Sequence, residues 1–285
     1  MSLTGKNAAI TGGSQGLGLA VTREFVRQGA SVAICGRHRA DLENAAQSLM
    51  GDGPGRVAYA VADVSRESDV DAFAAFCERE LGGTDALVCN AGVYGPKGSL
   101  EEIDWQAWRQ AIDINLMGAA YCCRAFLPQL VRSRRGKIIL MSGGGATKPL
   151  PYLSAYAASK AALVRFGETL AEELKPKRID VNMVAPGALN TRLLDEVIEA
   201  GPERVGAAFY EASLKQKQNG GTPLDRGAAL CAYLAGRESD GITGRLISAV
   251  WDPWERLHEV AEGLSATDIY TLRRIVPEDR GKAWN

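Results

Sequence analysis

The segment NAAITGGSQGLG, residues 7–18, joins a short apolar run to a glycine-rich turn, and the helix-like segment LAVTREFVRQGA follows directly. The glycines allow a tight backbone turn, so main-chain N–H groups at the positive end of the helix can approach a phosphate. Their spacing is G-x-x-x-G-x-G, not the G-x-G-x-x-G of the general dinucleotide pattern. We expect a nucleotide-binding turn formed by Gly12, Ser14, Gln15, Gly16, Leu17 and Gly18.

Further apolar runs repeat this layout along the chain. Each run is short, nearly continuous in apolarity and bounded by Gly, Asp or Pro, which is typical of strands in a parallel sheet buried on both faces. Segments long enough for helices separate the first six strands. The expected strands are residues 7–11, 31–35, 56–61, 86–90, 137–142, 179–184 and 245–250. The sequence therefore predicts an α/β fold with a doubly wound, parallel seven-stranded sheet and helices on both faces.

Length and composition favour a single folded domain. The chain has 285 residues, of which 46% are hydrophobic, enough to bury a substantial core. No repeat and no low-complexity linker divides it. We expect one domain over residues 1–250, followed by a C-terminal extension over residues 251–285 that packs on the same or a neighbouring subunit.

Charge and cysteine content exclude several classes of protein. A net charge of -1 and a pI near 6.2 give no basic excess, so neither nucleic acid nor an anionic membrane is an expected partner. No stretch approaches the roughly 18 apolar residues of a membrane span, and we expect a cytoplasmic protein. The six cysteines lack C-x-x-C spacing and the two histidines are far apart, which predicts buried thiols and no metal site.

A tyrosine and a lysine, Tyr156 and Lys160, stand four residues apart in a segment that reads as a helix. Residues at this spacing share a helix face, so the ammonium group can lie near the phenol or near a bound ligand. A Tyr-x-x-x-Lys pair arises easily by chance, and its meaning depends on the motifs around it.

Six short motifs follow one another between roughly residues 5 and 250. They are TGGSQGLG (11–18), DV (63–64), NAG (90–92), INLMG (114–118), YAASK (156–160) and PG (186–187). In this order and at these distances they resemble the short-chain dehydrogenase/reductase family. The resemblance implies a Rossmann-type fold and an NAD(P)-dependent oxidoreductase that interconverts a carbonyl and an alcohol by hydride transfer.

The resemblance also assigns cofactor contacts. It implies that Asp63 and Val64 contact the adenine, that Asn90, Ala91 and Gly92 form the wall beside the ribose, and that Pro186, Gly187 and Thr191 lie near the nicotinamide. The alternative for residues 90–92 is a loop that simply closes the fourth strand.

In the resembling family the tyrosine is the general acid and base, which here is Tyr156. A phenol has an ordinary pKa of about 10, and the positive charge of Lys160 is expected to lower it toward the working pH. The resemblance further implies that Asn115 supports a water-linked proton path to Lys160. The alternative for Asn115 is a buried polar residue that holds a helix bend.

The catalytic serine of the family departs from its usual place. It normally precedes the tyrosine by thirteen residues, where this chain has Gly143, whereas Ser142 precedes Tyr156 by fourteen. We favour Ser142 as the substrate-orienting donor, with the glycine-rich loop absorbing one residue. The alternative is that the donor is missing or is replaced by Thr147 or Ser154.

The residues after the second strand indicate the cofactor. An acidic residue there would bind the 2′-OH of NAD, whereas a basic residue accommodates the 2′-phosphate of NADP. This chain has Gly36 followed by Arg37, and a planar guanidinium suits a phosphate. We expect NADP(H) to be favoured over NAD(H), with Arg37 as the contact. The alternative is that Arg37 is a solvated loop charge or stacks on adenine.

The resemblance implies a small carbonyl or alcohol compound as substrate. The fold does not select its chemical class, and an anionic or sugar-like molecule is one candidate. The family's assembly implies a homodimer or homotetramer formed through the helices that carry Asn115 and Tyr156. A different class of function, a non-catalytic NADP(H)-sensing or scaffolding protein, is the alternative. Retention of Asn115, Tyr156 and Lys160 argues against it.

The extension beyond residue 250 is unusually long for the resembling family. Its apolar anchors are Trp251, Trp254, Tyr270 and Trp284. Two interpretations compete. The extension clasps a neighbouring subunit, or it reaches an active site where Arg273 or Arg274 binds an anionic substrate.

Overall fold

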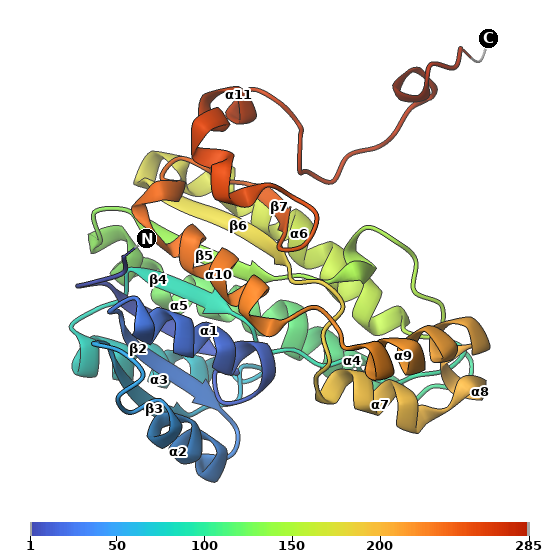
Figure 1. Ribbon diagram of the computed structural model, residues 1–285, viewed down its shortest axis with the longest axis horizontal. Coiled ribbons are helices and arrows are strands. Elements are labelled where there is room, and N and C mark those ends of the chain that lie inside the picture. Colours follow the sequence, from blue (N-terminus) through green and yellow to red (C-terminus); the bar gives the residue numbers. More distant parts are fainter. Residues whose placement is uncertain (1, 284–285) are drawn as a thin grey trace.

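The computed structural model describes residues 2–283 and contains one parallel sheet of seven strands (Figure 1). The sheet order is β3-β2-β1-β4-β5-β6-β7. The strands are β1 (Asn7–Thr11), β2 (Ser31–Gly36), β3 (Arg56–Val61), β4 (Ala86–Cys89), β5 (Gly136–Met141), β6 (Ile179–Ala185) and β7 (Arg245–Ser248). The predicted doubly wound α/β fold is confirmed, and β5 ends one residue earlier than expected.

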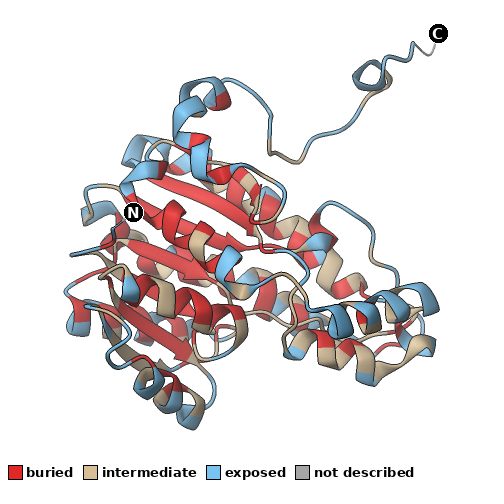
Figure 2. Cartoon of the chain, viewed as in Figure 1, coloured by how far each residue is buried: buried red, intermediate tan, exposed pale blue. Residues whose placement is uncertain are grey.

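Helices cover both faces of the sheet, and the strands are largely buried except for the edge strand β3, whose residues are exposed or half-buried (Figure 2). Buried side chains of α1 and α10 pack on one face, and those of α3, α5 and α6 pack on the other. The α-helices are α1 (Gly16–Arg27), α2 (Arg39–Ser48), α3 (Glu67–Leu81), α4 (Trp105–Ile112), α5 (Gly118–Arg132), α6 (Ser154–Leu174), α7 (Arg192–Ala200), α8 (Pro202–Val205), α9 (Ala207–Asn219), α10 (Leu224–Ala235) and α11 (Ala261–Ser265).

Short segments of other helix types connect these elements. A π-helical turn, η1 (Asp113–Met117), joins α4 to α5. The 3₁₀ turns are η2 (Gly144–Ala146), η3 (Lys175–Lys177), η4 (Arg237–Ser239), η5 (Trp254–Val260) and η6 (Pro277–Arg280).

The topology determines where a ligand can bind. All strands run in one direction, so the loops that follow them open at one edge of the sheet. The order reverses between β1 and β4, and open α/β sheets bind ligands in the crevice at such a point. The glycine-rich turn after β1 and residues 90–92 after β4 flank this crevice.

The first part of the C-terminal extension packs on its own chain. Trp254, Leu257 and Leu264 are buried in the core beside α10. The guanidinium of Arg245 donates hydrogen bonds of 2.7–2.8 Å to the main-chain carbonyls of Leu264, Thr267 and Ile269. From about residue 273 the chain extends away from the body (Figure 1). Trp284, one of the anticipated anchors, lies outside the described residues.

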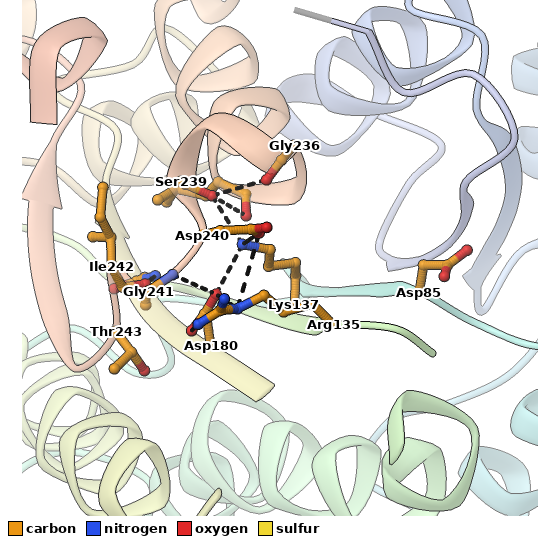
Figure 3. A network of polar contacts seen from close by, with 12 residues as sticks. Asp85, Arg135, Lys137, Asp180, Gly236, Ser239, Asp240, Gly241, Ile242 and Thr243 are labelled. Carbon is orange, nitrogen blue, oxygen red and sulfur yellow. Dashed lines mark hydrogen bonds and ion pairs between the residues drawn. The ribbon is translucent and has the colours of Figure 1, made fainter. Parts of the chain in front are cut away.

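A buried ion-pair network lies at the amino ends of β5 and β6 (Figure 3). The Nζ of Lys137 is 2.9 Å from a carboxylate oxygen of Asp180 and 2.8 Å from one of Asp240, and it donates a 3.2 Å hydrogen bond to Ser239 Oγ. Arg135 Nε lies 3.0 Å from Asp180. Lys137 and Asp180 are each only 4% exposed in their side chains. The network ties the amino ends of the central strands to the loop before β7.

The described chain contains neither a membrane-crossing helix nor a metal cluster. Among residues 2–283 no helix combines the length and apolarity that a crossing requires. Nor does any group of three or more His, Cys, Asp or Glu in that range lie where it could hold a metal ion. All six cysteines are buried and free.

We predict that Lys137→Met lowers the free energy of unfolding by about 3–5 kcal/mol, because it leaves the Asp180 carboxylate buried without its ammonium partner. Chemical denaturation measures this change. The control Arg132→Met breaks an exposed pair with Glu78 and should cost at most about 1 kcal/mol. Equal losses for the two variants would contradict a stabilising role for burial of this pair.

Candidate active site

A cavity of about 980 Å³ opens at the carboxyl ends of the strands. Its walls include every residue that the sequence assigned to the cofactor, and also Ser142. The cofactor set is Gly12, Ser14, Gln15, Gly16, Leu17, Gly18, Arg37, Asp63, Val64, Asn90, Ala91, Gly92, Tyr156, Lys160, Pro186, Gly187 and Thr191. Asn115 lies behind this wall and does not line the cavity.

The glycine-rich turn depends on close backbone contacts. Gly12 and Gly16 adopt φ angles of +63° and +51°, a conformation that glycine enters without strain. A Cβ at Gly18 would lie 2.0 Å from the carbonyl oxygen of Gly12. The side-chain amide of Asn90 donates to the carbonyl oxygens of Thr11 and Gly12 at 3.0 and 3.1 Å. Asn90 therefore holds the turn against the end of β4.

The start of α1 suits a diphosphate. Its first turn contains no acidic residue, and Gln15 at the N-cap forms no side-chain cap. The Gln15 amide instead donates to Asp41 at 2.8 Å. Main-chain N–H groups at the positive helix end thus remain available beside the cavity, and this donor set fits the diphosphate of NAD(P).

Arg37 and Asp63 lie together at the end of the cavity formed by β2 and β3. Although burial acts to raise it, the pKa of Asp63 is lowered, because Ser65 donates hydrogen bonds of 3.0 and 2.7 Å to its carboxylate and Arg37 is close by. Within residues 2–283, Arg37 is exposed and forms no ion pair shorter than 4 Å. Its guanidinium is therefore available to an anionic ligand.

Tyr156 and Lys160 project from the first two turns of α6. The Nζ of Lys160 lies 5.7 Å from the centre of the Tyr156 ring and donates a 2.7 Å hydrogen bond to the carbonyl oxygen of Met141, the last residue of β5. The lysine is only 4% exposed. This single carbonyl fixes the direction of a buried ammonium group.

Burial determines the proton affinity of both groups. It lowers the pKa of Lys160 to about 8, against a smaller opposing effect of Cys89. It raises the pKa of Tyr156, and the neighbouring Tyr94 adds to this rise. The expected lowering of the phenol pKa is therefore wrong for this geometry, because burial removes the solvation of the phenolate form.

Asn115 supports the site from behind. Its amide accepts a 2.8 Å hydrogen bond from the main-chain N–H of Val93 and donates to the Val93 carbonyl and to Ser159 Oγ, at 2.8 and 3.0 Å. Its position in η1 places it where α4 bends into α5. A Cβ at Gly92 would lie 3.3 Å from Asn115 Oδ1 and 3.5 Å from Lys160 Nζ. A side chain at Gly92 would therefore press on the Asn115 amide, whereas its contact with the ammonium group would be an ordinary one.

The loop after β5 does not present Ser142 to Tyr156. Ser142 Oγ is buried and has no hydrogen-bond partner among residues 2–283, and its main-chain N–H donates to the Val184 carbonyl. Gly143 instead faces the tyrosine, since a Cβ there would lie 2.3 Å from the Tyr156 hydroxyl oxygen. Successive residues of an extended chain point to opposite sides, so a shift of one residue turns the serine away. Of the alternatives, Thr147 lines the cavity, whereas Ser154 accepts a hydrogen bond from Trp108.

Several cavity residues belong to none of the six motifs. Tyr94 stands two residues after NAG, and its ring meets that of Tyr156 with 4.6 Å between centres. Trp251 lies at the cavity although 85% exposed. Other wall residues come from the loop after β5 and from α9; they are Lys148, Leu150, Phe209, Ser213 and Gln216. Proximity to a motif could have suggested Tyr94, and the segment after Pro186 and Gly187, which contains Phe209, Ser213 and Gln216, is the one expected to cover the site.

The tail arginines do not reach this cavity. Arg273 lies 2.7 Å from Asp279 and also pairs with Asp268, and neither Arg273 nor Arg274 lines the cavity of its own chain. The structure therefore does not place a tail arginine in the chain's own active site, because ion pairs hold Arg273 in the extended arm, whereas an arginine in a neighbouring subunit's active site stays a prediction.

Comparisons with known proteins agree with this geometry. The family model of short chain dehydrogenases matches residues 6–201. Human dehydrogenase/reductase SDR family member 4 is 30% identical over 248 residues, 86% of each chain. The 3-oxoacyl-(acyl-carrier-protein) reductase FabG of Chlamydia muridarum is 30% identical over 252 residues, covering 86% of this chain and 96% of its own. A dehydrogenase/reductase structure from Sinorhizobium meliloti 1021 aligns with a TM-score of 0.75 at 28% identity, covering 87% and 94%.

We predict that Gly143→Ala lowers turnover by about 10- to 100-fold, because the added methyl displaces the Tyr156 hydroxyl from its position. Steady-state kinetics and cofactor titration measure the effect, with cofactor affinity expected to stay unchanged. Gly144→Ala is the matched control, since its Cβ meets nothing within 4 Å. Equal activity in both variants would show that the wall at residue 143 does not constrain the tyrosine.

Proposed function

The chain belongs to the short-chain dehydrogenase/reductase family and is an NAD(P)-dependent oxidoreductase, and from this premise we propose that it interconverts a carbonyl and an alcohol with Tyr156 as general acid and base. The observation that carries the proposal is the pair at the start of α6. Tyr156 faces the cavity beside Gly143, and Lys160 is anchored by the carbonyl of Met141.

The proton step follows from the burial of the two groups. Because the pKa of Tyr156 is raised, its hydroxyl keeps its proton near neutral pH until a carbonyl oxygen gains negative charge beside it. The Lys160 ammonium donates one hydrogen bond to Met141 and has two further N–H donors. These donors can hold a bound ribose and stabilise the phenolate that forms when Tyr156 gives up its proton.

The cofactor supplies the hydride. We assign its diphosphate to the N–H groups at the start of α1 and its adenosine end to Arg37 and Asp63. NADP(H) is the proposed preference, supported by the exposed guanidinium of Arg37, which forms no ion pair shorter than 4 Å within residues 2–283, and by Gly36 at the position where an acidic residue would bind a 2′-OH. A Cβ at Gly36 would meet only ordinary contacts of 3.6 Å or more, so space is not what excludes an acidic residue there.

Assembly is the remaining proposal. Trp105 in α4 and Val131 in α5 are 55% and 46% exposed, on helices that flank the site. These exposed apolar side chains, on the two helices that the Asn115 turn joins, support a homodimer or homotetramer formed through these helices. Light scattering at micromolar concentration measures the oligomeric state, and a monomer would reject this assembly.

We predict that Tyr156→Phe lowers turnover of a carbonyl substrate by about 10²- to 10⁴-fold, the usual contribution of a general acid. Removal of the hydroxyl leaves the ring packing, so NADPH affinity should stay within a factor of about three. A panel of ketones and alcohols assayed with NADPH and NADP⁺ provides the measurement. Turnover close to that of the wild type would reject the proposed mechanism.

We predict that Arg37→Ala weakens NADPH binding by about tenfold or more and leaves NADH binding nearly unchanged, because only the 2′-phosphate loses a charge-assisted contact. Combining it with Gly36→Asp should reverse the preference toward NADH. Fluorescence titration gives both dissociation constants. If Arg37→Ala left their ratio unaltered, Arg37 would have no part in the choice of cofactor.

A further inference from the structure

Hydride transfer calls for a second hydrogen-bond donor to the substrate oxygen, besides Tyr156. Negative charge develops on the carbonyl oxygen as the hydride arrives, and a preorganised second donor typically contributes about 10²- to 10³-fold to such a step. The position facing Tyr156 from β5 is Gly143, which carries no donor side chain. Ser142 Oγ is enclosed and unpartnered. The end of β5 therefore supplies no hydroxyl to the reacting oxygen.

A second phenol lies on the other side of Tyr156. The ring of Tyr94 meets the Tyr156 ring edge to face, with 4.6 Å between centres and 69° between planes. Tyr94 lines the same cavity, and its hydroxyl forms no hydrogen bond within residues 2–283. The hydroxyl is thus free to act on a ligand in the cavity.

The surroundings of Tyr94 hold its ring in place and its proton on the oxygen. Lys97 Nζ lies 5.9 Å from the ring centre and 3.4 Å from the carboxylate of Glu196 in α7. Burial, with the charge of Glu196, raises the pKa of Tyr94. The phenol is consequently a donor near neutral pH, not a competing base.

We propose that Tyr94 is a catalytic residue that donates a hydrogen bond to the substrate oxygen in place of the family's serine. The inference rests on the proposed function and extends it to a two-tyrosine site. During reduction the carbonyl carbon gains the hydride, the oxygen takes the proton of Tyr156, and Tyr94 keeps its own proton throughout. In the oxidation direction Tyr156 accepts the alcohol proton while Tyr94 still donates to the same oxygen.

Two other hydroxyls compete for this role. Thr147 lines the cavity but is exposed in the loop after β5, with no contact that fixes its side chain among the described residues. Ser154 is paired with Trp108 Nε1 at 3.1 Å and does not line the cavity. Tyr94 alone combines a fixed ring, a free hydroxyl and contact with Tyr156.

The test compares Tyr94→Phe, Thr147→Val and Tyr156→Phe in NADPH-dependent reduction of the ketone of the above panel that the wild type reduces fastest. Tyr210→Phe, a half-buried tyrosine of α9 outside the cavity wall, is the matched control. A phenylalanine at 94 keeps the ring packing, so a merely structural role would leave kcat unchanged. Binding of isobutyramide to the NADPH complex repeats the comparison without turnover, because its carbonyl oxygen accepts the same hydrogen bonds.

We expect Tyr94→Phe to lower kcat by roughly 100-fold and to weaken isobutyramide binding, with NADPH affinity unchanged and Thr147→Val and Tyr210→Phe close to wild type. Wild-type kcat and isobutyramide affinity in Tyr94→Phe, beside an inactive Tyr156→Phe, would overturn the role of Tyr94 and leave the proposed function intact. A loss in Thr147→Val alone would assign the donor to Thr147 instead. Full activity in Tyr156→Phe would overturn the proposed function and this inference with it.

Discussion

The ammonium group of Lys160 lies inside the protein, where removal from water costs several kcal/mol unless other groups compensate the charge. The Met141 carbonyl at 2.7 Å is its one hydrogen-bond acceptor among the described residues. The neighbouring elements are arranged around that position. Asn115 fixes the backbone of Val93 and the side chain of Ser159, one residue before the lysine, and Gly92 leaves space for the Asn115 amide. At the carboxyl ends of the strands, the positive charge of Lys160 is thus only partly compensated.

A buried lysine lies near each end of β5, and the two lysines differ in how far their charge is compensated. At the amino end, Lys137 meets the carboxylates of Asp180 and Asp240, and the pairing stabilises the sheet. At the carboxyl end, Lys160 has no carboxylate partner among the described residues, and its pKa falls to about 8. Full compensation suits a structural site, whereas incomplete compensation leaves N–H donors for a ligand and a proton affinity close to the working pH.

The sequence predicted the strands and the location of the cavity, which follow from residue patterns. It could not predict the direction of single side chains. Apolar runs and glycine turns located the strands, and strand ends brought the assigned cofactor residues to one cavity. Ser142 lines the cavity, but β5 ends at Met141 and the next side chains alternate in direction, which places Gly143 and not Ser142 opposite the tyrosine. The pKa of Tyr156 is raised and not lowered as expected, because the sequence alone does not show how deeply a side chain is buried. Tyr94 became a candidate only because its ring contacts the ring of Tyr156 in the structure.

The pH dependence of kcat/KM for carbonyl reduction, in wild type and Lys160→Arg, tests most directly the claim that a buried ammonium group controls the acid. Lys160 is protonated below its pKa, so the account predicts that the wild-type value falls as the pH rises through about 8. Arginine stays charged throughout, so the residual activity of Lys160→Arg should lack this fall. A wild-type profile that stays flat from pH 6 to 10, or the same fall in both proteins, would contradict the account.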